Sequence, residues 1–341
     1  PALIRSTIRP LWRSGLPIAW QRRLTGALLN NGWVPRDAVV SETRLGGITT
    51  ELITPRGGAS ERIVFFVHGG GYVVCSPRTH RPLTSRLALA LSATTYVPHY
   101  RLAPEHPFPG GLDDVLAAYE GLLAKGAEPA NITLSGDSAG GGLALALALT
   151  LRDRGLPLPG RLVLISPWTD LTLSGETLRS KDGADPMLTW DWIIAKTPLY
   201  AGATAPEHPL VSPLFADFTG LPPTLVQVGS EEILLSDSER LAEREQLARW
   251  REAWPTQDAL MFVSAAAVQR FFAEPVSPGP GQTRFWAPGP GTARALSQAL
   301  WSLGIGSERI DAALLDAHPQ LRKVLLEQLE QGLKSQYSLK H

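Results

Sequence analysis

The sequence predicts an α/β fold in which a mostly parallel sheet is covered by helices on both faces. From about Val40 onward, short apolar runs alternate with helix-like stretches, which is the pattern of βαβ units. Runs such as Ile63–Val67 and Leu162–Ser166 are almost entirely apolar, as expected for strands that are buried on both faces. The chain has 341 residues, of which 44% are hydrophobic, so it has enough apolar material for such a core.

The individual elements follow in order along the chain. Strands rich in β-branched and aromatic residues are expected at Ile48–Thr54, Ile63–Val67, Thr94–Val97, Ile132–Ser135, Leu162–Ser166 and Pro223–Val228. Helices with apolar residues at helical spacing are expected at Pro82–Leu91, Leu112–Lys125, Gly140–Arg152 and Leu321–Leu333. Tryptophans, prolines and helix breakers at about 171–221 predict an excursion from the sheet, and the prolines and glycines between Pro275 and Gly291 predict a loop.

These patterns divide the chain into three parts. Residues 1–40 predict amphipathic helices that lie over the next domain, residues 41–245 predict an α/β core with an insertion at about 171–221, and residues 246–341 form an atypical segment. The first 30 residues carry five arginines and no acid, a composition found in transit peptides and interfacial helices. Pro10, Gly15 and Pro17 interrupt them and no apolar signal core follows, so we expect cap helices instead.

Composition argues against several classes of partner. The 32 lysines and arginines balance 32 acids, and only 19% of residues are charged, which predicts no binding to nucleic acid or to an anionic membrane. No apolar run reaches the roughly 18 residues that a membrane-spanning helix needs. The single cysteine, Cys75, cannot form an internal disulfide, which predicts a cytoplasmic protein. The oligomeric state stays open, a homodimer included.

The strongest motif is Gly136-Asp137-Ser138-Ala139-Gly140, a G-x-S-x-G between an expected strand and an expected helix. Glycines on both sides allow a tight strand-to-helix turn that exposes the Ser138 hydroxyl at the edge of the sheet. The helix N-terminus and the Ala139 N–H then favour the oxyanion that forms when Ser138 attacks a carbonyl. A glycine-rich turn capped by a serine would have the same sequence, so the surrounding motifs decide between the two interpretations.

A second motif, His68-Gly69-Gly70-Gly71, directly follows the expected strand Ile63–Val67. Successive glycines expose backbone N–H groups, so Gly69 and Gly70 are expected to donate to the same oxyanion. A simple glycine hinge is the competing interpretation. The order of the two motifs, each after its own strand, favours the oxyanion loop.

With both motifs present, the chain resembles the α/β-hydrolases of the hormone-sensitive-lipase type, mostly small bacterial carboxylesterases. The resemblance runs from about Val40 to Glu243, and within that range it rests on the two glycine motifs and on Tyr100–Pro107, Ser166–Trp168 and Asp185-Pro186. It implies an α/β-hydrolase fold with an α-helical cap. It also implies that Ser138 is the nucleophile and that Gly69, Gly70 and Ala139 form the oxyanion hole.

The resemblance implies an acid in a turn after the strand that follows the cap. Here that turn reads Gly229-Ser230-Glu231-Glu232-Ile233-Leu234, and Glu232 matches the acid position. Its carboxylate would hold the catalytic imidazole in the correct tautomer and stabilise the imidazolium. A carboxylate that merely interacts with a helix N-terminus is the better interpretation of Glu231 and Asp237.

The family's histidine is absent from its expected position. The usual turn reads Trp-Pro-x-x-x-His, whereas Trp254-Pro255 is followed by Thr256–Met261 without a histidine. His318 follows Glu232 in the order Ser, acid, His, and the terminal His341 is the other histidine beyond the acid. His318 is therefore the candidate base, although its place before Pro319 also suits the start of a surface helix.

Residues 256–311 resemble a fragment of uroporphyrinogen-III synthase, the enzyme that closes the tetrapyrrole ring. The likeness rests on Asp258–Val268 and Arg284–Leu296, and it departs from that family at Ala266. Such a fragment lacks most of the cleft for a linear tetrapyrrole, so synthase activity is not expected. A natural fusion, a cloning junction and chance similarity all stay open.

The predicted function is hydrolysis of short- to medium-chain carboxylic esters through a serine acyl-enzyme, impaired if no histidine reaches Ser138. The expected partner is a small-molecule ester. No cofactor or metal is expected, because the sequence shows neither the spacing of metal-binding residues nor a phosphate-binding loop. Bulky residues in and near the cap stretch, such as Trp168 and Trp192, would narrow the pocket. The alternative is a catalytically inactive ligand-binding protein on the same scaffold, as in the plant gibberellin receptors, which lack the histidine.

Overall fold

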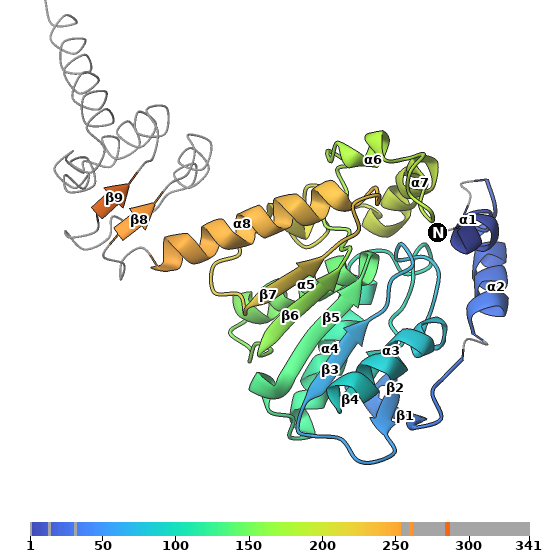
Figure 1. The fold of residues 1–341 in the computed structure, drawn as a ribbon, viewed down its shortest axis with the longest axis horizontal. Coiled ribbons are helices and arrows are strands. Elements are labelled where there is room, and N and C mark those ends of the chain that lie inside the picture. Colours follow the sequence, from blue (N-terminus) through green and yellow to red (C-terminus); the bar gives the residue numbers. More distant parts are fainter. Residues whose placement is uncertain (1, 13–14, 31–32, 254–258, 262–283, 287–341) are drawn as a thin grey trace, which may run out of the picture. The chain divides into compact units, whose positions relative to one another are not determined.

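The computed structural model describes residues 2–12, 15–30, 33–253, 259–261 and 284–286 (Figure 1). The chain divides into two units, Pro1–Arg244 and Glu245–His341. The first unit contains the sheet, both glycine motifs and Glu232. Of the second, the structure describes the end of one helix and two short strands.

A seven-stranded sheet forms the centre of the first unit. Its strands are β1 (Ala38–Leu45), β2 (Ile48–Pro55), β3 (Ile63–Val67), β4 (Thr94–Pro98), β5 (Ile132–Asp137), β6 (Arg161–Ile165) and β7 (Thr224–Gln227). They lie in the order β1-β2-β4-β3-β5-β6-β7. From β4 to β7 all neighbours are parallel, whereas β2 is antiparallel to both β1 and β4. The predicted mostly parallel α/β sheet is confirmed.

The strand β1 was not among the expected strands, because the sequence Ser41-Glu42-Thr43-Arg44 lacks the apolar character of the others. It forms an edge hairpin with β2, in which Leu45 pairs with Ile48. The two-residue turn between them is Gly46-Gly47, and both glycines have positive φ (52° and 84°). This is the turn conformation that matches the twist of a hairpin.

Helices cover both faces of the sheet. The helices that contact its strands are α3 (Pro77–Leu91), α4 (Gly110–Ala124) and α5 (Ala139–Asp153). A 3₁₀ turn at Pro129–Asn131 precedes β5, and α8 (Leu235–Ala253) follows β7. Neighbouring residues of β3 point to opposite faces: Phe65 packs edge-on against Tyr119 of α4, while Phe66 belongs to a core cluster with Ala88 of α3. The sheet is therefore buried on both sides, as its apolar strands require.

Helix α3 begins five residues earlier than the apolar pattern suggested. Ser76 and Thr79 form a reciprocal capping box, and Pro77 occupies the first turn, where its missing N–H is not needed. These cap residues are polar, so apolar spacing alone does not reveal them.

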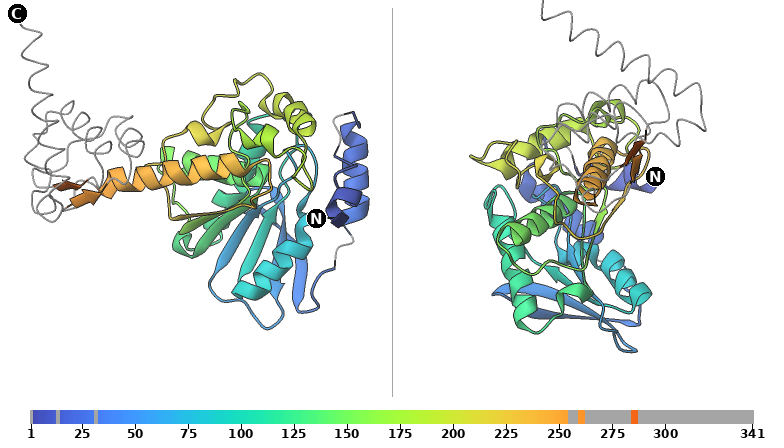
Figure 2. Two further views of the ribbon diagram at one scale, coloured as in Figure 1. Left: turned by 45° about the horizontal axis from the view of Figure 1, so that its top comes forward. Right: turned by 90° about the vertical axis from the view of Figure 1, so that its left-hand side faces the viewer.

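Two chain segments form the cap region above the sheet. The first contains α1 (Ala2–Thr7) and α2 (Ile18–Leu29), and the second contains α6 (Thr177–Ser180), α7 (Trp190–Ala201) and the 3₁₀ turn Pro213–Phe215. The α1–α2 segment lies beside α7 (Figure 2), where the rings of Trp12 and Trp192 stack with centroids 5.0 Å apart. Arg9 donates to the carbonyls of Asp182 and Asp185, which joins the two segments further.

In the second unit, β8 (Ala259–Met261) and β9 (Arg284–Trp286) pair in parallel as a separate two-stranded sheet. The expected helix Leu321–Leu333 and His318 lie outside the described residues. Of the expected loop Pro275–Gly291 the structure describes residues 284–286, and there the prediction is wrong, because they form the strand β9. Among the helices that the structure describes, none is long and apolar enough to cross a membrane.

Candidate active site

Ser138 occupies the turn between β5 and α5 in a strained backbone conformation. Its φ is 51° and its ψ is −123°, a region that residues with a side chain seldom adopt. The Ser138 N–H donates to the carbonyl of Ile165 (2.9 Å), and its own carbonyl accepts from the Trp168 N–H (2.9 Å). Strain held by such bonds to neighbouring loops is characteristic of a nucleophile elbow.

The flanking glycine Gly140 allows the start of α5 to approach the backbone at the end of β3. A Cβ on Gly140 would collide with the backbone carbonyls of Val67 and His68. Only glycine therefore lets α5 start so close to the end of β3, and this contact brings the serine turn beside the His68–Gly71 loop. The N–H groups of the first turn of α5, beginning at Ala139, point away from the helix body and have no partner within it.

The glycine loop also needs its glycines. Gly70 has a φ of 116° and Gly71 a φ of 59°, and a Cβ at Gly71 would enter the ring of Trp192. The Gly70 carbonyl accepts from the N–H groups of Val73 and Val74, which closes the loop into a tight turn.

The structure differs from the expectation for Gly69. Its N–H donates to Asp137 Oδ1 at 2.9 Å, so this donor is already committed to a carboxylate. Among the residues that the structure describes, the N–H groups of Gly70 and Gly71 have no such acceptor. The two available donors of the loop are therefore those of Gly70 and Gly71.

Asp137, the residue before Ser138, also contacts a histidine of α3. His80 of α3 places Nε2 3.3 Å from each carboxylate oxygen of Asp137. Burial disfavours the charged form of both groups, but their mutual attraction outweighs it, so the pKa of His80 is raised and that of Asp137 is lowered. Hydrogen bonds from Gly69 and His80 contribute to the lowering at Asp137. The pair joins the serine elbow, the glycine loop and α3.

His68, at the start of the glycine loop, is fully buried and uncharged. Burial, with the charge of His80 as a second cause, lowers the pKa of His68 to about 3. Its ring stacks on Tyr100 at 4.3 Å, and the Tyr100 hydroxyl donates to the His68 carbonyl at 2.7 Å. His68 thus anchors the loop and is not placed as an acid or base.

The acid candidate Glu232 lies in the turn after β7. Its Oε1 accepts from the N–H of Gly229, in the same turn, at 2.9 Å, and the side chain is half-buried. The turn is tied to the cap by Asp185, whose Oδ2 accepts from the Ile233 N–H at 2.9 Å. Asp185 is buried and also accepts from Met187 and Leu188. The motif Asp185-Pro186 is visible in the sequence, but the role of Asp185 depends on its contact with Ile233, which lies 48 residues later.

Asp237, just beyond this turn, is a fully buried carboxylate. Its Oδ2 accepts from the N–H groups of Thr169 and Asp170, at 2.8 and 2.9 Å. Its Oδ1 has no partner among the described residues. Burial raises the pKa of Asp237 to about 7. Asp237 lies in the first turn of α8, as expected, and this buried side chain also organises the loop after β6.

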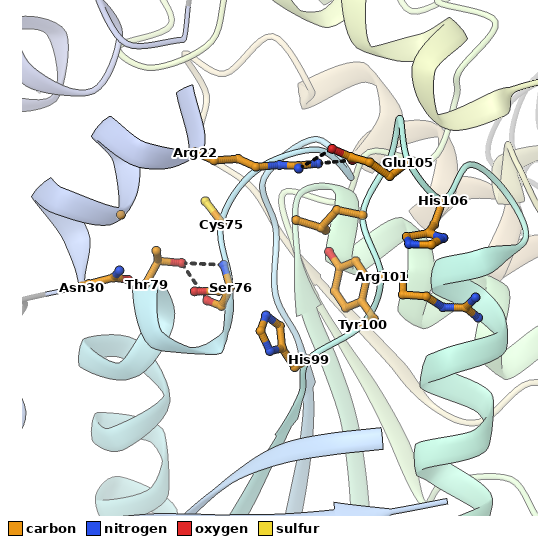
Figure 3. Close-up of a pocket in the computed structure, with 12 residues that line it drawn as sticks. Arg22, Asn30, Cys75, Ser76, Thr79, His99, Tyr100, Arg101, Glu105 and His106 are labelled. Carbon is orange, nitrogen blue, oxygen red and sulfur yellow. Dashed lines mark hydrogen bonds and ion pairs between the residues drawn. The ribbon is translucent and has the colours of Figure 1, made fainter. Parts of the chain in front are cut away.

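A cavity of about 630 Å³ opens between α2 and the loops that follow β3 and β4 (Figure 3). Across its mouth, Arg22 binds both carboxylate oxygens of Glu105 (2.7 and 2.8 Å) and the carbonyls of Val73 and Ala103. Ser138 does not line it; its wall includes Cys75, whose pKa burial raises to about 12. The described residues contain no cluster of side chains suited to hold a metal ion.

Comparison with known proteins places the chain in a family. Residues 64–253 match the sequence profile of the alpha/beta hydrolase fold. An acetyl-hydrolase of Streptomyces hygroscopicus is 40% identical over 244 residues, which cover 70% of this chain and 80% of that protein. An esterase of Acinetobacter venetianus is 43% identical over 206 residues, covering 60% of this chain and 68% of that protein.

Solved structures agree with this placement. The crystal structure of an esterase from the bacterial hormone-sensitive lipase family aligns with a TM-score of 0.69 and 31% identity, covering 95% of this chain and 97% of that one. The chain therefore belongs to the α/β-hydrolase fold family and, within it, to the carboxylic ester hydrolases that resemble hormone-sensitive lipase.

Proposed function

We propose that the chain hydrolyses short- to medium-chain carboxylic esters through an acyl-enzyme on Ser138. The observation that carries this proposal is the bond between the Gly69 N–H and Asp137, because it holds the glycine loop against the residue that precedes Ser138. A strained serine beside free backbone donors is the arrangement that acyl transfer requires.

In the proposed reaction, Ser138 Oγ attacks the ester carbonyl carbon and its proton passes to a base. The carbonyl oxygen becomes an oxyanion, held by the N–H groups of Gly70, Gly71 and Ala139, with Gly71 in the place first expected for Gly69. The alcohol leaves with a proton, and water then attacks the acyl-enzyme to release the acid and restore Ser138.

Bulky rings near the glycine loop favour a small acyl group. Trp192 is 1% exposed and packs where a Cβ of Gly71 would lie, and Trp168 is fully buried behind the elbow. Such rings narrow a cleft while they provide apolar contact for a short chain. The name of the Streptomyces relative, an acetyl-hydrolase, agrees with this substrate size.

The base is the incomplete part of the proposal. Glu232 is the proposed acid, and His318 is the proposed base only by its order along the chain, since Thr256–Met261 contains no histidine. Without a base, the donors and the pocket alone would support hydrolysis about 10³ to 10⁴ times faster than water. We therefore expect slow turnover.

The missing histidine also favours a second candidate, a binding protein that uses the same pocket without catalysis. Ester turnover distinguishes the two. We expect p-nitrophenyl butyrate to be hydrolysed faster than the palmitate ester, and Ser138→Ala to abolish turnover above background. Equal rates for the chain and Ser138→Ala would favour the binding protein, and faster palmitate hydrolysis would exclude the narrow pocket.

Three broader expectations stay predictions. They are a cytoplasmic location, which rests on the single Cys75, a domain boundary near residue 245, and a fragment of uroporphyrinogen-III synthase at about 256–311. Size-exclusion chromatography with light scattering would determine whether the chain forms a homodimer.

A further inference from the structure

The total charge of zero conceals a strong separation of charge along the chain. The first 104 residues contain 13 arginines, no lysine and four acids, a net charge of +9, whereas residues 105–244 carry a net charge of −10. No acid occurs before Asp37, and none between Arg62 and Glu105. The expectation that this protein has no affinity for an anionic surface used only the sum, so it does not apply to the N-terminal part.

The basic part also exposes unusually many large apolar side chains. Trp33 is 65% exposed, Trp20 51% and Leu28 45%, and Leu83 and Leu91 of α3 are exposed as well. Among the other residues with described side chains, the large apolar ones that are also exposed are Val39 of β1, Ile194, Phe215 and Leu225. Isolated exposed leucines are ordinary, but this concentration on α2, on the segment after it and on α3 marks an interaction surface.

These exposed side chains belong to α2, to α3 and to the segment after α2, and the two helices contact each other. On α2, Trp20 and Arg23 are three positions apart and lie on one side of the helix, with Leu28 further round it, and on α3 Leu83 and Arg86 are also three positions apart. We call these five residues together with Trp33 the α2–α3 face.

Arginine and tryptophan are paired on this face. The Arg23 guanidinium lies 5.5 Å from the centre of the Trp20 ring, and that of Arg86 lies 5.3 Å from the Trp33 ring. Neither arginine forms an ion pair among the described residues. Amphipathic aromatic rings and basic groups together suit the boundary between lipid headgroups and acyl chains.

The same two helices also line the cavity described above. Arg22 and Gly26 of α2, Asn30 at the C-terminal end of α2, and Thr79 of α3 contribute to its wall. A membrane that binds these helices would therefore hold the cavity close to molecules dissolved in the membrane.

We propose that the α2–α3 face binds the surface of a membrane rich in anionic phospholipids. Positive charge complements the headgroups, and Trp20, Leu28, Trp33 and Leu83 enter the outer acyl region, without any helix crossing the bilayer. The occupant is the lipid surface itself, and a second copy of the chain or another polyanion are outcomes that the test separates.

Flotation with vesicles tests the proposal and needs no catalysis. The full chain carrying Ser138→Ala is mixed with vesicles of phosphatidylcholine, with or without 30% phosphatidylglycerol, at low and high salt. We expect binding to the anionic vesicles only, weakened by salt. The double variant Arg23→Glu/Arg86→Glu should lower the partition coefficient at least about tenfold, as should Trp20→Ser/Trp33→Ser.

A matched control reverses two exposed arginines elsewhere, Arg154 and Arg161, and should bind like the parent. Equal loss in the control would show a non-specific charge effect and overturn the proposal. So would equal binding to neutral vesicles, or a light-scattering mass that shows the α2–α3 variants have lost a dimer. Thermal melting of each variant separates loss of binding from loss of folding.

Discussion

The nucleophile side and the acid side of the site are built in different ways. On the nucleophile side, Ser138 is fixed by β6, Asp137 binds the glycine loop and His80, and Gly140 touches the carbonyls at the end of β3. On the acid side, Glu232 binds only the N–H of its own turn in the described structure, after β7, which ends the sheet. The Asp137 carboxylate thus joins distant segments, whereas the Glu232 carboxylate contacts only its own turn, although the backbone of that turn is bound to the cap through Asp185 and Ile233.

This difference indicates which parts of the reaction the chain can support by itself. Every contact named on the nucleophile side comes from residues within Pro1–Arg244. The oxyanion donors therefore need nothing from the second unit, whereas a base that follows Glu232 in the sequence must come from it.

A matched pair of glycine substitutions gives the largest contrast between the two sides. Gly140→Ala forces a Cβ into the backbone of Val67 and His68, so we expect a loss of about 3 kcal/mol or more in the free energy of unfolding. Gly229→Ala meets only the movable carboxylate of Glu232 at 2.7 Å, so we expect a loss below about 1 kcal/mol. Urea unfolding measures both, and similar losses would contradict the contrast.

The Asp137–His80 pair should make the nucleophile side sensitive to pH. Because the pKa of His80 is raised above 6.5, its contribution is complete below 6.5 and is lost as the pH rises through the folded-state value. Because the pKa of Asp137 is lowered below 3.8, its contribution is present above 3.8 and is lost as the pH falls through the lower value. The pair therefore stabilises most between pH 3.8 and 6.5.

We expect His80→Gln to destabilise the protein by about 2 kcal/mol at pH 5.5 and by clearly less at pH 8.5. The exposed His106 provides the control, since His106→Gln removes a histidine outside this contact. The account fails here if His80→Gln has the same effect at both pH values, or if the control reproduces its pH dependence.

Asp237, next to the acid turn, should affect stability in the opposite direction to Asp137, because its pKa is raised. Its pKa is raised to about 7, so ionisation costs stability progressively as the pH rises from 3.8 to about 7. Asp237→Asn keeps an acceptor for the Thr169 and Asp170 N–H groups and removes that cost. We expect it to stabilise the protein by about 1 kcal/mol at pH 8 and to have little effect near pH 4, as measured by thermal melting. A destabilised variant at pH 8 would show that the charged form is preferred.

The sequence predicted the sheet and the serine elbow well, because both depend on local signals. Apolar strands and glycine spacing report directly on burial and on tight turns, and β3, β5 and α5 lie within one or two residues of their expected bounds. Polar elements were harder: β1 is an edge strand with little apolar character, and the start of α3 depends on the capping residues Ser76 and Thr79.

The site's polar contacts could not be predicted in the same way. That Asp137 occupies the Gly69 N–H, and that His80 meets Asp137, depend on bonds between residues 68 and 57 positions apart. Nothing in the local sequence of either motif indicates such a partner. The same applies to Asp185 and Ile233, since only the fold brings the cap beside the acid turn.

The most direct test of the account compares the rates of p-nitrophenyl butyrate hydrolysis by the chain, by Ser138→Ala and by His318→Ala. If the nucleophile side works without a base from the second unit, Ser138→Ala should fall to background, while His318→Ala should stay within tenfold of the parent rate. A loss of about a thousandfold on His318→Ala would contradict the account and make His318 the histidine of a complete triad.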